Sequence, residues 1–282
     1  MRCVERVCAA CVQFCAGPDK AENIARMEPL VERAAALGAE LVLLPEKWNA
    51  ASDGPRLLED AEQIDAGPTV EAMRGWARRH RLVLVGGSIS VRRGERVANV
   101  SPVFDSDGEL CASYQKIHLF DVEVGGFTYR ESALTEPGEE PVLAEVAGLR
   151  LGLSVCYDVR FPELYAALAL AGADILTVPA NFTQTTGMAH WEVLLRARAI
   201  ETGSYVLAAA QHGFPDAGRR PSYGHSLIVD PWGTVLAGAP DGDGVIAAEL
   251  DGTRQRDVRR RLPSLAHRRE DAYGRLAART PA

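Results

Sequence analysis

The stretch Leu149–Pro162, Leu-Arg-Leu-Gly-Leu-Ser-Val-Cys-Tyr-Asp-Val-Arg-Phe-Pro, determines how the rest of the chain is interpreted. Its first half alternates leucine or valine with small or charged residues, the two-residue period of a strand buried on at least one face. Proline cannot continue a β-ladder but suits the first turn of a helix, so Pro162 predicts that a helix begins there. Cys156 therefore lies between the end of a strand and the start of a helix.

A cysteine in that position can be a nucleophile or a small core residue. The dipole at a helix N-terminus and nearby cations lower the pKa of a thiol, and the thiolate is the form that attacks carbonyl groups. Cysteine is also a common core residue, so this stretch alone favours the structural role. The choice between the two depends on residues elsewhere in the chain.

The composition is that of an ordinary globular protein with a large core: 282 residues, of which 47% are hydrophobic and 24% charged. The net charge of −7 argues against binding of nucleic acid or an anionic membrane through a basic surface. Arg2, Glu5 and Arg6 interrupt the start of the chain before any apolar run of signal-peptide length, and no uncharged apolar stretch of about 18 residues follows. We therefore expect a cytoplasmic protein without a nucleic acid or membrane partner.

The six cysteines are expected to be reduced thiols in such a protein. Cys8, Cys11 and Cys15 are spaced closely enough to suggest a metal site. However, no cysteine or histidine pair follows at a matching spacing, and the segment 7–14 is apolar and typical of a strand. The sequence therefore predicts no bound metal.

Helix and strand patterns alternate along the chain without a low-complexity linker, which predicts a single domain over residues 1–282. Helices are expected over 22–37, 69–79, from 162, and over 188–201, and strands over 41–45, 82–85, 99–104, 110–115 and several segments after 205. The segments 38–45 and 172–179 resemble each other. A chance match is one explanation, and the other is a pseudo-symmetric sandwich in which both strands are central and end near one site.

A cysteine nucleophile requires a base for its proton and a group that stabilises the charge on the attacked oxygen. Glu46 directly follows the strand 41–45, and Lys116 stands at the end of the strand 110–115. A surface glutamate and a lysine that extends to solvent are the ordinary alternatives. Suitable residues thus stand at three separate strand ends, and the pattern alone does not bring them together.

Three motifs in this order resemble the nitrilase superfamily of carbon–nitrogen hydrolases: Leu44–Glu46 (Leu-Pro-Glu), Tyr114–Phe120 (Tyr-Gln-Lys-Ile-His-Leu-Phe) and Ser154–Glu163 (Ser-Val-Cys-Tyr-Asp-Val-Arg-Phe-Pro-Glu). The resemblance covers nearly the whole chain. Further motifs at 186–192, 196–201, 223–226 and 230–233 are similar to the branch that contains deaminated glutathione amidase and omega-amidase.

The resemblance implies an αββα sandwich with two mixed central sheets. It also implies dimerisation through helices, and we expect the tail from about residue 254 to 282 at the dimer interface. No metal or organic cofactor is required for the chemistry of this family, and the expected partners are a small-molecule amide and a second copy of the chain.

The implied mechanism uses four side chains. Glu46 removes the proton of Cys156, the thiolate attacks the amide carbon, and Lys116 stabilises the oxyanion together with the backbone N–H of Tyr157. Ammonia leaves, and water activated by Glu46 hydrolyses the thioester. Glu131 matches the second active-site glutamate of the family, and a simple ion pair with its neighbour in sequence is the alternative for that residue.

Named amidases of this branch act on small carboxylated amides, which makes deaminated glutathione amidase the leading expectation. The alternatives are an omega-amidase that acts on 2-oxoglutaramate or 2-oxosuccinamate, another aliphatic amidase, or an N-carbamoyl hydrolase. Arg160 is the candidate for binding a substrate carboxylate, with a structural pair to Asp158 or Glu163 as the alternative. The expected pocket walls are Tyr157, Phe120, Tyr129, Phe182 and Thr183. Two departures from the family pattern, 47–48 and 125–127, are expected to shape the pocket rim.

Two hypotheses from other classes remain at this point. A papain-like thiol hydrolase would pair Cys156 with His118, His190, His212 or His225, but it leaves the glutamate and lysine motifs unexplained. A non-catalytic interaction protein could keep the sandwich fold, although the intact Glu, Lys and Cys motifs argue against the loss of catalysis.

Overall fold

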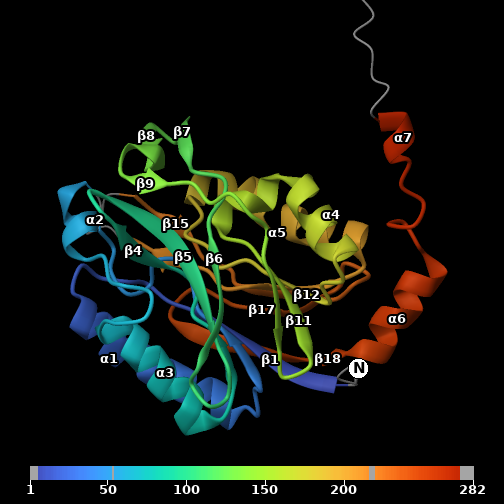
Figure 1. Cartoon of the computed structure of the whole chain (residues 1–282), viewed down its shortest axis with the longest axis horizontal. Helices are drawn as coiled ribbons and strands as arrows, with labels where there is room; N and C mark the ends of the chain where they lie inside the picture. The colour runs from blue at the N-terminus through green and yellow to red at the C-terminus, as the bar shows by residue number, and fades with distance from the viewer. Residues whose placement is uncertain (1–5, 53, 216–219, 274–282) are drawn as a thin grey trace, which may run out of the picture.

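The computed structural model describes residues 6–52, 54–215 and 220–273. Two sheets lie face to face in the middle of the molecule, and each carries helices on its outer face (Figure 1). The layers are therefore helix, sheet, sheet and helix. The αββα sandwich with two mixed sheets, expected from the sequence, is confirmed.

The first sheet has three parallel strands flanked by antiparallel ones. Its strands are, across the sheet, β18 (Gly244–Asp251), β1 (Arg6–Gln13), β2 (Leu41–Leu43), β3 (Val83–Val85), β5 (Arg96–Phe104) and β4 (Ile89–Arg93), with β6 (Leu110–Gln115) and β9 (Thr135–Glu136) also paired to β5. β2 lies between β1 and β3 and runs parallel to both. The continuous apolar run at this position is typical of a strand that is covered on both faces.

The second sheet repeats this arrangement. Its strands are β10 (Leu143–Val146), β11 (Leu149–Leu153), β12 (Ile175–Thr177), β13 (Tyr205–Ala208), β16 (Leu227–Val229) and β17 (Val235–Gly238). β12 lies between β11 and β13 and is parallel to both. β2 and β12, which lie within the two similar segments of the sequence, are thus both central, as the pseudo-symmetric interpretation expected.

Helices cover the two outer faces. α1 (Lys20–Ala36) and α3 (Pro68–His80) pack on the first sheet, where Met27 and Met73 join Val42 in one core cluster. α4 (Pro162–Leu170) and α5 (Gln184–Thr202) cover the second sheet. The shorter helices are α2 (Pro55–Glu59), α6 (Gly252–Arg261) and α7 (Glu270–Tyr273), and Figure 1 shows α6 and α7 leading away from the sandwich. No helix among the described residues is long and apolar enough to cross a membrane.

Two helix starts differ from the sequence-based expectation. α1 begins at Lys20 despite Pro29 in its interior, because the carboxylate of Asp19 caps it by accepting the N–H of Glu22 at 2.8 Å. α5 begins at Gln184, four residues before the expected start. Its first turn is polar and contains glycine, so the sequence pattern did not indicate a helix there. Thr183 caps this turn by accepting the N–H of Thr186.

Small hairpins escaped the sequence interpretation. β7 (Asp121–Val124) pairs with β8 (Phe127–Arg130), and β14 (His212–Gly213) pairs with β15 (Ser222–Tyr223). The glycines 125 and 126, which both have positive φ, form the turn of the first hairpin. These strands are too short to produce a readable alternation, yet both hairpins contribute to the walls of the site.

Candidate active site

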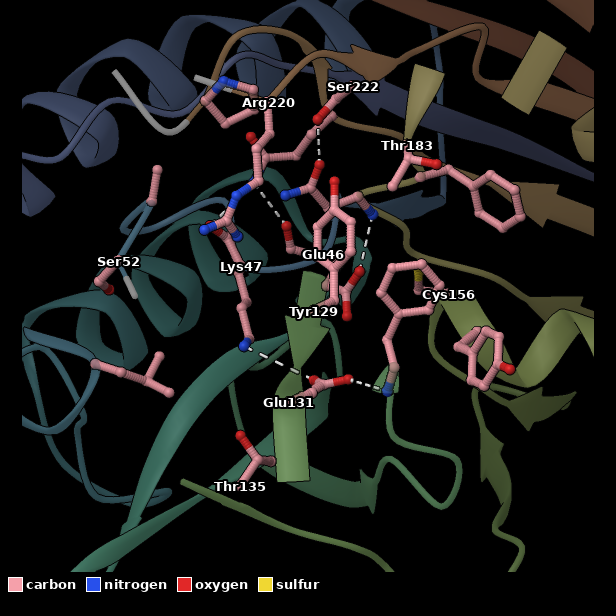
Figure 2. Close-up of a pocket in the computed structure, with 18 of the residues that line it drawn as sticks. Glu46, Lys47, Ser52, Tyr129, Glu131, Thr135, Cys156, Thr183, Arg220 and Ser222 are labelled. Atoms are coloured by element: carbon pink, nitrogen blue, oxygen red, sulfur yellow. Dashed lines mark hydrogen bonds and ion pairs between the residues drawn. The ribbon is translucent and has the colours of Figure 1, made fainter. Parts of the chain in front are cut away.

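A cavity of about 380 Å³ opens where the strands of both sheets end (Figure 2). Glu46 follows β2, Lys116 follows β6, Cys156 follows β11, and Asn181 and Gln211 follow β12 and β13, and all five residues line this cavity. Ends of parallel strands are where α/β sheets place functional groups. The structure therefore brings together residues that the sequence placed at separate strand ends.

Cys156 stands at a sharp turn between β11 and α4. Its φ of 51° lies in the left-handed region, which is uncommon for a residue with a side chain. The N–H of Cys156 donates to the carbonyl of Pro179 at 2.9 Å, and a 3₁₀ turn, η2 (Cys156–Arg160), continues the chain. The turn leaves the cysteine 7% exposed, with its thiol at the edge of the cavity.

Asp158 fixes that turn and connects it to the segment that carries the lysine. Its fully buried carboxylate accepts the N–H of Val155 and the hydroxyl of Tyr114, both at 2.8 Å. It also accepts the backbone N–H of His118 at 3.1 Å and lies 2.7 Å from Nδ1 of the same residue. The side chain of Asp158 therefore fixes the position of the cysteine turn relative to the end of β6.

Glu46 is buried and held on both sides of its carboxylate. Oε1 accepts from Asn99 Nδ2 at 2.9 Å and from Lys116 Nζ at 3.1 Å, and Oε2 accepts the backbone N–H of Asn181 at 2.8 Å. Its carbonyl accepts from Nε2 of Gln211 at 2.8 Å. Main chain and side chain are thus anchored to both sheets, and the glutamate is not a surface residue.

Lys116 lies between two carboxylates and is only 2% exposed. Its Nζ is 2.8 Å from Glu131 Oε2 and 3.1 Å from Glu46 Oε1. Burial by itself would lower the pKa of this lysine, but the charges of Glu131 and Glu46 more than offset that effect and raise its pKa well above the usual value. The lysine therefore carries its positive charge throughout the physiological pH range.

Glu131 forms the second wall of the charged cluster. Oε2 also accepts the N–H of Phe120 at 2.8 Å, and Oε1 lies 3.8 Å from Nζ of Lys47. Burial would raise the pKa of Glu131, but the charges of Lys116 and Lys47 and the hydrogen bonds lower it to about 2. The carboxylate pairs with these lysines and makes no ion pair with Arg130 among the described contacts.

The thiol of Cys156 is protonated before substrate arrives. Burial and then the negative charge of Glu46 raise its pKa well above the ordinary value, and Lys116 only partly opposes this. The sequence-based expectation of a lowered pKa is therefore wrong, because burial and the carboxylate of Glu46 raise it and a 3₁₀ turn separates Cys156 from the start of α4 at Pro162. The carboxylate of Glu46 is thus the group that interacts with the thiol and is available to accept its proton.

All the expected pocket residues except Arg160 line the cavity. Tyr157, Phe120, Tyr129, Phe182 and Thr183 are all among its walls, where Phe120 contacts Tyr129 and Tyr157 with ring centroids 5.0 and 5.1 Å apart. This arrangement provides an apolar wall beside the thiol.

Arg160 does not line the cavity. Its guanidinium lies over the rings of Phe182 and Tyr157, 5.1 and 5.8 Å from their centroids, and 3.3 Å from Nδ1 of His190. Among the described contacts it pairs with neither of the acids proposed as its alternatives, because Asp158 is occupied by the groups named above. The geometry gives no support to a direct role of this arginine in binding a substrate carboxylate.

The two residues of the first departure from the family pattern, 47–48, have different roles. Lys47 lines the cavity and pairs with Glu131, as a rim residue would. Trp48 does not: it is fully buried in the core of the first sheet, where its Nε1 donates to the carbonyl of Gly86 at 2.9 Å. The expectation that 47–48 shapes the rim is therefore correct for the lysine and wrong for the tryptophan, and the residues 125–127 are not among the described residues that line the cavity.

Four functional candidates were missed by sequence reasoning: Asn99, Asn181, Gln211 and Arg220. Asn181 and Gln211 directly follow strands of the second sheet, and the strand-end argument used for Glu46 could have found them. Asn99 is a polar residue inside the buried strand β5, which is also a readable signal. Arg220 lines the cavity with its guanidinium 5.2 Å from the ring centroid of Tyr129, and no sequence pattern marked it.

The described lining carries more positive than negative charge. Lys47, Lys116, Arg130 and Arg220 face only two carboxylates there. The whole chain is acidic, so this cavity is a local positive site that can concentrate anionic ligands. Figure 2 shows Lys47 and Arg220 on the side of the cavity across from Cys156.

The described residues argue against a papain-like site. No histidine is among the described residues that line the cavity, which leaves a papain-like arrangement without its base. The described part of the chain also holds no group of three or more His, Cys, Asp or Glu side chains arranged to bind a metal ion. The chemistry available at this site is that of a thiol, two carboxylates and a lysine.

This fold and this site define a class of protein, and comparison with known proteins identifies the same class. Residues 8–260 match the family model of the carbon–nitrogen hydrolases. The chain belongs to the carbon–nitrogen hydrolase family. It is an amidase, a hydrolase of carbon–nitrogen bonds other than peptide bonds.

Particular relatives are similar over most of their length. Deaminated glutathione amidase of Homo sapiens is 44% identical over 276 residues, which cover 95% of this chain and 84% of that protein. The chloroplastic omega-amidase of Arabidopsis thaliana is 40% identical over 90% of this chain and 70% of that protein. Among solved structures, the C. elegans NitFhit protein superposes with a TM-score of 0.89 at 38% identity, over 96% of this chain and 67% of that one.

Proposed function

We propose that Glu46, Lys116, Cys156 and Glu131 hydrolyse the amide bond of a small anionic substrate through a thioester. The observation that carries this proposal is Lys116, buried between the two carboxylates, one of which also raises the pKa of the thiol. A buried lysine held in this way supplies a fixed positive charge next to the nucleophile. Such a preorganised charge is suited to a developing oxyanion.

The acylation step moves one proton and exchanges one bond. As the sulfur of Cys156 attacks the amide carbon, its proton passes to Glu46, and the carbonyl oxygen becomes an oxyanion beside Nζ of Lys116 and the N–H of Tyr157. The tetrahedral intermediate collapses, the C–N bond breaks, and Glu46 returns the proton to the leaving nitrogen. Glu131 keeps Lys116 charged and in place during both steps.

The second step releases the acid. Glu46, ionised again, removes a proton from a water molecule, and the resulting hydroxide adds to the thioester carbon. The C–S bond breaks, the proton on Glu46 returns to the sulfur, and the product leaves as the carboxylic acid, which loses its proton to solvent. One base thus serves twice, which is consistent with its attachment to both sheets through Asn181 and Gln211.

For the substrate we propose deaminated glutathione, with 2-oxoglutaramate as the alternative. The relatives with these activities in their names are similar over most of this chain. Deaminated glutathione carries two carboxylates and 2-oxoglutaramate carries one, so the excess of positive charge in the described lining favours the former. A cavity of about 380 Å³ is within the range of small-molecule sites.

The leaving group differs between these substrates. A primary amide such as 2-oxoglutaramate releases ammonia, as expected from the sequence. Deaminated glutathione has a substituted amide nitrogen, so it releases cysteinylglycine instead. Both acyl parts become 2-oxoglutarate, and that product is the measurement that compares them fairly.

The test is release of 2-oxoglutarate from both compounds by the purified protein, with ammonia release from a neutral aliphatic amide measured in parallel. Cys156→Ala is the control and should lose about 10⁴-fold or more in kcat, since it removes the attacking atom. A higher kcat/KM for deaminated glutathione supports the leading proposal, and a higher value for 2-oxoglutaramate moves the assignment to omega-amidase. Turnover of neither compound by the wild-type protein contradicts both.

We also infer that the chain forms a homodimer through α5. Met188, Val193 and Ile200 on this helix are 71%, 67% and 45% exposed, and Trp232, in the turn adjacent to Ile200, is 56% exposed. A second copy related by a twofold axis would bury these exposed apolar side chains against their counterparts. Light scattering should give twice the chain mass, and Val193→Glu should give the monomer.

The remaining expectations stay proposals. We propose that residues 1–282 form one domain and that the tail from about 254 adjoins the dimer interface. Its helix α6 is attached to the second sheet by Arg259, which pairs with Asp174 at 3.0 Å, while residues 274–282 lie outside the described part. The free thiols of Cys8, Cys11, Cys15, Cys111 and Cys156 support a cytoplasmic location.

A further inference from the structure

Asn99 is a buried amide in the middle of the charged cluster. It belongs to β5, is 1% exposed, and donates through Nδ2 to Glu46 Oε1 at 2.9 Å and to Glu131 Oε1 at 3.2 Å. We propose that Asn99 is a positioning residue of the active site, which holds both carboxylates through the two hydrogens of one amide group. This inference rests on the proposed function, in which Glu46 is the base.

Asn99 and Lys116 bridge the same two carboxylates. Lys116 Nζ contacts Glu46 and Glu131 at 3.1 and 2.8 Å, so four side chains form a closed ring in which the two bridges are one cation and one neutral amide. The β-ladder places both bridges, because the carbonyl of Asn99 accepts the N–H of Lys116 at 2.9 Å. Two carboxylates this close repel each other, and the amide of Asn99 adds a second bridge that holds them together beside the lysine.

The chemistry of the side chain explains why an asparagine suits this position. A primary amide has two N–H donors and carries no charge, whereas a serine has one donor and an ionised aspartate has none. Both acceptors are carboxylates, so the nitrogen must face them. The buried Oδ1 of Asn99 has no hydrogen-bond partner in the described structure, so the two carboxylates alone set the orientation of this amide.

The bridge also selects which oxygen of Glu46 can act as the base. Oε1 accepts from both Asn99 and Lys116, while Oε2 accepts only the N–H of Asn181 among the described contacts. Oε2 therefore keeps a lone pair that is unused among the described contacts, and we expect this oxygen to take the thiol proton.

Asn99→Ala removes both hydrogen bonds and tests this role. We expect kcat/KM to fall roughly 10–100-fold, as for the loss of hydrogen bonds to charged groups, with KM changed by less than about threefold. Without the donors the ionised carboxylates lose stabilisation, so the acidic limb of the profile of kcat/KM against pH should move to higher pH. A side chain that only fills space would leave that limb where it is.

Asn99→Asp gives a second readout with almost the same shape. A protonated aspartic acid donates one hydrogen and can hold one glutamate, whereas the ionised form donates none and repels both. The activity of this variant relative to the wild-type protein should therefore decrease as the pH rises. The two variants respond to pH in opposite directions, which a general loss of stability would not produce.

A matched control separates positioning from folding. Asn23 is also fully buried, and its amide donates to the carbonyls of Gly17 and Asn49 at 2.8 and 3.0 Å, outside the cavity. Asn23→Ala should lower the melting temperature but leave the acidic limb unchanged. If it shifts the limb as much as Asn99→Ala does, the positioning role is wrong.

A readout without an amide substrate separates this inference from the proposed function. The rate of alkylation of Cys156 by iodoacetamide, followed on its own peptide by mass spectrometry, depends on proton transfer from the thiol. If no amide is turned over but Asn99→Ala slows this alkylation and shifts its acidic limb, the proposed function fails and the role of Asn99 stands. The other outcome is that the wild-type protein turns over amide, and that Asn99→Ala changes kcat/KM and the alkylation rate by less than twofold. If the acidic limbs of both pH profiles also stay in place, the role of Asn99 is overturned.

Discussion

The backbone N–H of Asn181 donates to Oε2 of Glu46 at 2.8 Å, and this hydrogen bond joins the two sheets at the active site. Glu46 follows the segment 38–45, and Asn181 follows the similar segment 172–179. The two central strands β2 and β12 thus deliver a side chain and a main-chain donor to one point. The position of the base therefore depends on the packing of the two sheets against each other.

Replacement of Lys116 by methionine removes the positive charge and keeps the bulk of the side chain. We expect kcat to fall at least about 10²–10³-fold, because the oxyanion loses its charged donor and two carboxylates are left without their shared partner. Steady-state kinetics with the best amide substrate measures this. Lys20→Met is the control, since Lys20 pairs with Glu62 at 2.9 Å outside the cavity. A near-normal rate for the Lys116 variant would remove the lysine from the mechanism.

Much of this site could be predicted because strand ends are readable in the sequence. The apolar runs before Glu46, Lys116 and Cys156 mark buried strands, and the proline at 162 marks the helix start that places the cysteine in a turn. The three motifs, in their order along the chain, indicated the family. Hydrophobic alternation and motifs therefore predict the arrangement of the layers and the principal side chains of the active site.

The remaining features depend on contacts that no local pattern encodes. Arg160 follows the nucleophile closely in sequence, yet the 3₁₀ turn directs it over Phe182 and away from the cavity. Arg220 reaches the cavity because Pro221 and Ser222 bond to the segment that begins α5: the N–H of Gln184 donates to the carbonyl of Pro221 at 2.9 Å. Such placements follow from tertiary packing, which the spacing of residues along the chain does not reveal.

Asp158→Ala should destabilise the protein by roughly 3–5 kcal/mol, as for the loss of a buried, fully bonded charge. The change leaves the hydroxyl of Tyr114 and the N–H groups of Val155 and His118 buried without their acceptor. Urea unfolding followed by circular dichroism measures the free energy of unfolding. Asp121→Ala, an exposed carboxylate that accepts from Ser132, should cost about 1 kcal/mol or less. Equal costs for the two variants would contradict the bracing role of Asp158.

The pH dependence of stability should report on Glu131. Its pKa in the folded protein is lowered to about 2, whereas an unfolded glutamate has a pKa of about 4.3. Because folding favours the ionised form, its contribution to stability is fully present above about pH 4.5 and is lost as the pH falls towards 2.

Glu131→Gln should therefore flatten the decrease in unfolding free energy between about pH 4.5 and 2.5, measured by urea unfolding at a series of pH values. Glu123→Gln is the control, because its side chain is 73% exposed and its pairing with Arg130, at 3.5 Å, is on the surface. If the unfolding free energies of the wild-type protein and the Glu131 variant fall with equal slopes over this interval, the pKa of Glu131 is not lowered in the folded protein.

Arg220 and Arg160 make opposite predictions about substrate selectivity. If Arg220 binds a substrate carboxylate, Arg220→Met should raise KM for deaminated glutathione or 2-oxoglutaramate roughly 10–100-fold, the effect of losing a charge-assisted hydrogen bond. The KM for the neutral aliphatic amide should change much less, and Arg220→Lys should recover part of the loss by restoring the charge without the planar fork.

Arg160→Met removes a guanidinium that packs on the rings of two pocket residues, so it should change KM for carboxylated and neutral amides alike. A selective loss in the Arg160 variant, with equal losses on all substrates in the Arg220 variant, would reverse this assignment.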